Sequence, residues 1–169
     1  MLEKNRGKPL VDIAAYCLMP NHPHLLLREI DYGGISTFMQ KLGTGYTMYF
    51  NKKYQRTGAL FSGRFKAVHV ESDAQFRRLL NYIHANPAEL YEPGWKKGIV
   101  RDEALLKKKL QAYPFSSLLD YEGVKRPHNV VVNMRAAMNI LDAAPSFKSL
   151  LADARIFYRR EKDFLKDFE

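Results

Sequence analysis

The stretch Met19-Pro20-Asn21-His22-Pro23-His24-Leu25-Leu26-Leu27 places two histidines two residues apart, directly before an apolar run. In an extended strand successive side chains alternate between faces, so His22 and His24 share one face. Two neutral imidazoles on one face can hold a divalent cation and leave positions open for a third ligand and a substrate oxygen. The alternative is a pair of polar side chains on a half-exposed strand, and an H-x-H motif by itself leaves both interpretations open.

The segments around this stretch predict two strands separated by a kink. Residues 11–18 alternate partly between apolar and polar side chains, which is typical of a strand. Pro20-Asn21 interrupts the pattern, and residues 22–28 resume as a second extended segment. Pro23 cannot donate a ladder hydrogen bond and is typical of an edge or a bulge.

The next part of the chain predicts two helices and one further strand. Apolar residues at spacings of three and four predict a long helix over residues 35–54, and residues 65–70 predict a strand fed by a loop. Ser72-Asp73-Ala74-Gln75 is a capping-box pattern that begins a second helix. That helix must end near Asn86, because Pro87 disfavours helical geometry in the residue before it.

Two polar residues lie beside the buried stripe of this second helix. Tyr82 lies off the centre of the stripe, and Asn86 follows one turn later on the same side. From the helix alone we expect a tyrosine at the edge of the core with its hydroxyl in water, and a plain C-terminal cap at Asn86.

The C-terminal half is mostly helical by pattern. A basic helix is expected around residues 102–111, and the segment 113–118 is a short aromatic element that packs back on the rest. The pattern from Asn133 onwards is helical, and the charged stretch 155–169 predicts a surface helix or a frayed tail. The single cysteine, Cys17, lies in an apolar run and is expected to be a buried small residue.

The charge balance favours a polyanionic partner. The net charge is +9. No apolar run reaches membrane-spanning length, and residues 1–8 lack the apolar core of a signal peptide, so we expect a cytoplasmic protein. Between Tyr32 and Val70 there is no acidic residue. A solvated lysine-rich face is the alternative, but interleaved aromatic side chains favour a phosphate-binding surface. Its candidate residues are Lys41, Tyr46, Lys52, Lys53, Arg56, Arg64 and Lys66.

Three blocks, 19–26, 58–67 and 82–87, resemble those of single-tyrosine HUH transposases, with the REP-associated tyrosine transposases (IS200-like) as the closest branch. The resemblance implies an α+β fold, a ferredoxin-like antiparallel sheet with packed helices, with both histidines on a central strand. Members of the family begin with an extra strand and helix, which this chain is expected to lack. We therefore expect an N-terminally truncated catalytic domain over residues 1–120 and a C-terminal helical extension over residues 121–169.

The resemblance also implies the chemistry. His22, His24 and Asn86 would bind Mg²⁺ or Mn²⁺, and Tyr82 would be the nucleophile that forms a 5′-phosphotyrosine. The partner would be single-stranded or hairpin DNA, bound by the basic surface, and the family includes both monomers and homodimers. Two alternatives remain open: a remnant that binds hairpin DNA without cutting it, and an unrelated RNA-binding protein, which would give Tyr82 no role.

Overall fold

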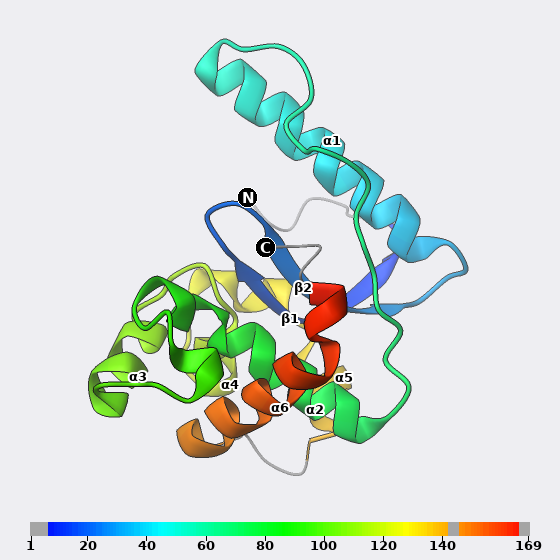
Figure 1. Cartoon of the computed structure of the whole chain (residues 1–169). Helices are drawn as coiled ribbons and strands as arrows, with labels where there is room; N and C mark the ends of the chain where they lie inside the picture. The colour runs from blue at the N-terminus through cyan, green and yellow to red at the C-terminus, as the bar shows by residue number, and fades with distance from the viewer. Residues whose placement is uncertain (1–6, 142–145, 166–169) are drawn as a thin grey trace. The chain divides into compact units, whose positions relative to one another are not determined.

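The computed structural model describes residues 7–141 and 146–165, and only the backbone of residues 136 and 162–165. Within these residues the chain is α+β, with a two-stranded antiparallel sheet and several helices (Figure 1). The strands and longer helices are β1 (Val11–Leu18), β2 (Pro23–Glu29), α1 (Gly34–Tyr54), α2 (Asp73–Ala85), α3 (Glu103–Gln111) and α6 (Phe147–Leu165). The short elements are η1 (Asn86–Leu90), η2 (Trp95–Lys97), α4 (Leu118–Tyr121), η3 (Pro127–Val131) and α5 (Met134–Met138).

The contacts of the chain form two compact units. Unit 1 consists of Met1–Asp12 and Leu27–His69, and unit 2 consists of Ile13–Leu26 and Val70–Glu169. The turn between β1 and β2 and the strand residues beside it, Ile13–Leu26, therefore belong to unit 2. All the described helices after α1 belong to unit 2 as well.

The two expected strands are confirmed. The backbone N–H of Met19 donates to the carbonyl oxygen of His22 at 2.9 Å and closes the turn between them. Pro23 is the first residue of β2, a position where a strand tolerates the missing N–H. Within the described residues β2 pairs with β1 alone, so the histidines are not on the expected central strand.

The expected aromatic element packs on the other edge of β1. The N–H of Leu18 donates to the carbonyl oxygen of Phe115 at 2.8 Å, and the N–H of Ser117 donates to that of Tyr16 at 3.0 Å. The hydroxyl of Tyr113 donates to the carbonyl oxygen of Leu18 at 2.7 Å. A single antiparallel bridge joins the two segments, so this edge of β1 is covered.

The strand predicted over residues 65–70 is wrong. These residues form no strand, and the side chains of Phe65 and Lys66 are exposed. A run of strand-forming residues is stabilised only by pairing with a neighbour, and within the described residues this run pairs with no strand.

Unit 1 is built around α1, which begins at Gly34, one residue before the predicted start of this helix. A Cβ at Gly34 would lie 2.4 Å from the carbonyl oxygen of Leu10, so the close approach of the helix to this backbone requires glycine. At the other end, the amide nitrogen of Asn51 donates to the carbonyl oxygen of Gly58 at 2.9 Å and ties the following loop to the helix.

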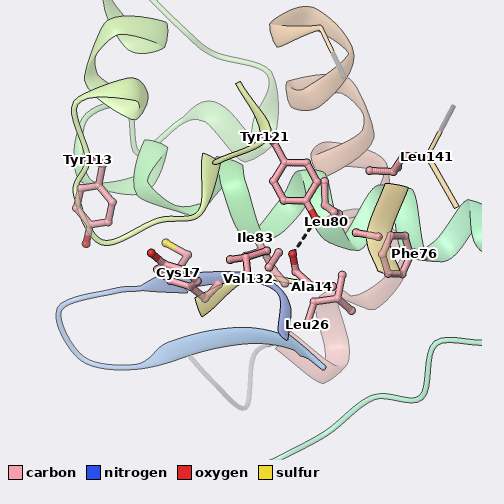
Figure 2. Packing of buried hydrophobic residues seen from close by; sticks show 13 residues of the cluster. Ala14, Cys17, Leu26, Phe76, Leu80, Ile83, Tyr113, Tyr121, Val132 and Leu141 are labelled. Carbon is pink, nitrogen blue, oxygen red and sulfur yellow. Dashed lines mark hydrogen bonds between the residues drawn. The ribbon is translucent and has the colours of Figure 1, made fainter. Parts of the chain in front are cut away.

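In unit 2, helix α2 is buried on two faces. On one face Leu80 and Ile83 pack against the strands in the cluster that Figure 2 shows. In the same cluster the hydroxyl of Tyr121 donates to the carbonyl oxygen of Ala14 at 2.7 Å. On the other face Tyr82 belongs to a second apolar cluster. The other members of that cluster are Ala85, Ala88, Trp95, Leu106, Leu110, Leu118, Leu150, Leu151, Ala154 and Phe157.

His84 fixes α2 to strand β1 through a buried hydrogen-bond network. Its side chain is fully buried, and its Nε2 lies 2.8 Å from the Oγ of Ser117. That hydroxyl also accepts the backbone N–H of Tyr16 at 2.9 Å. Burial, and to a smaller extent the positive charge of Arg126, lower the pKa of His84 from 6.5 to about 3.

The lowered pKa of His84 predicts that acid weakens the fold. Below pH 6.5 the unfolded chain binds a proton on His84 that the folded chain excludes. The stability that neutral His84 contributes to the fold is therefore fully present above pH 6.5 and is lost as the pH falls towards 3. The free energy of unfolding should fall by about 1.4 kcal/mol per pH unit between about pH 6 and about pH 4 from this group. Urea denaturation of His84→Gln should show a shallower dependence on pH, whereas the exposed His128→Gln should match the unsubstituted chain.

Candidate active site

The two histidines converge, as their spacing predicts. The Nε2 atoms of His22 and His24 lie 2.9 Å apart. Their ring centroids are 4.6 Å apart and the ring planes are nearly perpendicular, at 79°. The start of β2 therefore directs two imidazole nitrogens to one point in space.

Asn21 sets the tautomer of His22. The Nδ1 of His22 lies 2.8 Å from the side-chain oxygen of Asn21. Because an amide oxygen can only accept, Nδ1 carries the proton, and the Nε2 of a neutral His22 keeps its lone pair. Burial, and to a smaller extent the charges of His22 and Lys96, lower the pKa of His24 to about 3, so His24 is neutral near pH 7. In the 2.9 Å contact the Nε2 of His24 carries the proton and donates to the Nε2 of His22. A metal bound to both Nε2 atoms would therefore require the proton of His24 to move to its Nδ1.

Tyr82 lies next to this pair. Its ring centroid is 5.9 Å from that of His24, and the two rings meet edge to face at 83°. The tyrosine is only 2 % exposed, so the expectation of a core-edge tyrosine with its hydroxyl in water is wrong. The rings of Phe157 from α6, at 5.1 Å, and Trp95 from η2, at 6.4 Å, cover it.

Asn86 caps the C-terminus of α2, as the helix pattern predicts. It follows α2 as the first residue of η1, it is 4 % exposed, and its Nδ2 donates to the carbonyl oxygen of Tyr82 at 3.2 Å. This bond uses the amide nitrogen, so Oδ1 is the atom that could ligate a metal. In the described part of the chain no three His, Cys, Asp or Glu side chains form a metal-binding group. The candidate ligands that the structure brings together are the imidazole nitrogens of His22 and His24.

The sequence interpretation missed three residues of this site. Asn21 precedes the first histidine directly, and a hydrogen-bonding neighbour of a candidate ligand is a usable signal. Trp95 lies between the second helix and the basic helix expected around residues 102–111. Phe157 lies in the charged stretch 155–169, which predicts a surface helix or a frayed tail. Neither of these two carries a local signal for contact with Tyr82.

The seven candidate DNA-binding residues all lie in unit 1 and are all exposed. On α1, Tyr46 packs 6.3 Å from Phe61 of the following loop. The Nζ of Lys53 lies 5.8 Å and 5.3 Å from the ring centroids of Tyr49 and Tyr54. Hydrogen bonding to Tyr49 raises the pKa of Lys53 above its ordinary value. Cations and aromatic faces therefore share one exposed side of the helix.

A groove of about 410 Å³ runs beside this surface within unit 1. Gly43 lines the groove, and a Cβ there would meet only the ring of Phe61, at 4.0 Å. Arg64 and Phe65 from the following loop line it as well. The groove therefore offers apolar contact and a positive charge together.

Comparison with known proteins gives one match. A family model described as "Transposase IS200 like" matches residues 2–86, just over half of the chain. The matched region includes both histidines, Tyr82 and Asn86. No curated protein and no solved structure matches the chain. None of the described helices is long and apolar enough to cross a membrane.

The aromatic cover of Tyr82 should contribute measurably to stability. Phe157→Ala opens a cavity beside the tyrosine and should lower the free energy of unfolding by about 3 kcal/mol. The neighbouring Ile156 is 40 % exposed, so Ile156→Ala should cost much less. Urea denaturation measures both variants, and equal effects would contradict the packing described for α6.

Proposed function

Because the chain belongs to the IS200-like transposase family, we propose that this transposase nicks and rejoins single-stranded DNA at hairpin-forming ends, with Tyr82 as the nucleophile. The observation that carries the proposal is the position of Tyr82, whose ring lies 5.9 Å from that of His24. A nucleophile-bearing ring beside two converging imidazoles is an arrangement suited to phosphoryl transfer.

A divalent cation fits the ligands that the site offers. His22 and His24 would supply Nε2, and Asn86 would supply its amide oxygen. Imidazole ligands suit Mn²⁺ and related ions, whereas Mg²⁺ prefers oxygen ligands and keeps several waters. When bound, the ion would neutralise part of the charge that develops on a non-bridging phosphate oxygen.

The residues of the chain account for the covalent step. The hydroxyl oxygen of Tyr82 attacks the phosphorus in line, and the bond to the 3′-oxygen breaks. The proton lost by the tyrosine is balanced by the proton gained at the 3′-hydroxyl, and a 5′-phosphotyrosine remains. Because one phosphodiester replaces another, a second 3′-hydroxyl can reverse the step without ATP, and rejoining is the same reaction in reverse.

Unit 1 supplies the proposed DNA-binding surface. Residues 33–70 carry no acidic residue, so the exposed cations there are not balanced within this segment. Basic side chains attract the phosphate backbone, and exposed rings such as those of Tyr46 and Tyr49 stack on bases. This combination favours single-stranded nucleic acid over a fully paired duplex.

Tyr82→Phe tests the chemistry. The chain, incubated with Mn²⁺ and a labelled pool of single-stranded hairpin oligonucleotides, should give a covalent protein–DNA adduct that survives a denaturing gel. Tyr82→Phe should give no adduct, because it lacks the attacking oxygen. The control is Tyr91→Phe, a tyrosine outside the histidine pair, which should leave the adduct unchanged.

Two results would contradict the catalytic role. An adduct that persists in Tyr82→Phe would assign the nucleophile to another residue. Hairpin binding with no adduct in either protein would support the alternative function, a hairpin-binding protein that does not cut DNA.

A pair of glycines on α1 tests whether the groove binds bases. Gly43→Leu fills the groove. The matched control is Gly45→Leu, because a Cβ at Gly45 meets nothing within 4 Å. Both changes replace a glycine inside a helix and should each stabilise the chain by up to about 1 kcal/mol. Only Gly43→Leu should weaken binding of the hairpin pool, by about tenfold if one stacked base is lost, as fluorescence anisotropy would measure. Equal affinities of the two variants would exclude the groove from the binding surface.

A further inference from the structure

Trp95 covers Tyr82 and is itself held from two directions. Its ring centroid lies 6.4 Å from that of Tyr82, the ring planes are tilted by 34°, and the tryptophan is fully buried. The indole N–H donates to the Oε2 of Glu89 at 3.1 Å. The Nε of Arg155 on α6 donates to the backbone carbonyl oxygen of Trp95 at 2.8 Å. The bond to Arg155 therefore holds the backbone of Trp95, whereas the bond to Glu89 holds its ring.

The acceptor that Glu89 provides is a strong one. A buried N–H without a partner destabilises the conformation that buries it, so the indole turns to keep its N–H at the carboxylate. Hydrogen bonds to an ionised acceptor are stronger than those between neutral groups. The Nζ of Lys96 lies 3.3 Å from the same Oε2 atom and 4.8 Å from the ring centroid of Tyr158. The side chain of Glu89 is 40 % exposed, so its two partners define its position more than burial does.

Glu89 also belongs to the element that holds the backbone of Tyr82. It lies on η1, which begins with Asn86. The Nδ2 of Asn86 donates to the carbonyl oxygen of Tyr82 at 3.2 Å. The element η1 therefore contacts the backbone of Tyr82 through Asn86, and it acts on the ring of Tyr82 through Glu89 and Trp95. One short helix holds both parts of the candidate nucleophile.

The orientation of the tyrosine ring decides where the attacking oxygen lies. The proposed attack needs this oxygen in line with the bond that breaks, and an error of about 1 Å can lower a rate about 100-fold. The ring of Tyr82 meets that of His24 edge to face at 5.9 Å, so a turn about its Cα–Cβ bond would move the oxygen relative to the histidine pair. The indole of Trp95 packs beside the tyrosine ring and restricts such a turn.

We propose that Glu89 is a positioning residue for the attack by Tyr82, because its carboxylate orients Trp95 and the indole holds the tyrosine ring beside His24. The inference rests on the proposed function of Tyr82. It adds a residue that acts through another side chain and does not contact DNA. Its signature is a slower covalent step with an unchanged affinity for DNA.

The test compares Glu89→Ala with Glu89→Gln and with Glu92→Gln. Glu89→Gln keeps an oxygen that can accept the indole N–H. Glu92 is the matched control, because it is an acidic residue of the same segment whose carboxylate pairs with Arg101, at 3.4 Å.

Three readouts separate positioning from binding and folding. The first is the single-turnover rate of adduct formation with Mn²⁺ and a saturating concentration of the labelled hairpin pool. The second is the affinity for that pool in EDTA, measured by fluorescence anisotropy. The third is the anisotropy decay of tryptophan emission, which reports on Trp95 alone because the chain has one tryptophan.

For Glu89→Ala we expect the adduct rate to fall by about tenfold to 100-fold, with a faster anisotropy decay of Trp95 and an unchanged affinity. Glu89→Gln should keep most of the rate, and Glu92→Gln should match the unsubstituted chain in all three readouts. Trp95→Phe removes the N–H but keeps a ring, so it should also slow the reaction. Adding Glu89→Ala to Trp95→Phe should slow it no further. If circular dichroism shows that Glu89→Ala does not fold, the rate of Trp95→Phe decides the test.

Three results would overturn the inference. An unchanged adduct rate in Glu89→Ala, or in Trp95→Phe where that variant decides, would show that the indole does not position the tyrosine. A higher rate would show that the indole obstructs the attack. A full further loss when Glu89→Ala is added to Trp95→Phe would show that Glu89 does not act through Trp95.

The same assay distinguishes this inference from the proposed function. A Tyr82-dependent adduct whose rate does not respond to Glu89 would contradict the inference alone. Absence of any adduct in the unsubstituted chain would contradict the proposed function and the inference with it.

Discussion

The structure of unit 2 depends on the burial of two faces of one short helix. Leu80 and Ile83 of α2 pack on the strand hairpin, and Tyr82 packs under Trp95 and Phe157 on the other side. Thirteen residues cannot form a stable isolated helix, so α2 takes its stability from both layers. The distance between Tyr82 and His24 is therefore set by segments that lie far apart in the sequence.

This dependence explains which features could be predicted from the sequence. The strand hairpin, the start of α2 at Ser72 and the long helix α1 follow from local patterns and caps, and all three are confirmed. The burial of Tyr82 could not be predicted, because it depends on α6 about 70 residues later, and a helix pattern does not say which partner covers its flank. The strand expected at residues 65–70 failed for the same reason, since a strand needs a partner that the local sequence does not name.

The histidine pair shows how neighbouring residues decide what an H-x-H motif can do. Spacing alone brings the rings to one face, but protonated rings would repel each other and any cation. Burial keeps His24 neutral, and the hydrogen bond to Asn21 directs the proton of His22 away from the shared point. The residues that make the motif usable as a ligand pair are thus outside the motif itself.

The positive charges of this chain differ in their surroundings, and the difference has consequences for function. Lys41, Lys52 and the other cations of unit 1 are exposed, so each contributes a salt-sensitive attraction that does not depend on sequence. Lys96 is buried and paired, so its interaction is screened little and its position is fixed. Exposed charges attract a flexible polyanion without fixing it in one position. The charge of Lys96 instead joins η2 to η1, because Glu89 of η1 binds both its ammonium group and the indole N–H of Trp95. The two kinds of charge therefore act on different parts of the molecule: the exposed cations on its surface field, and Lys96 on the packing beside Tyr82.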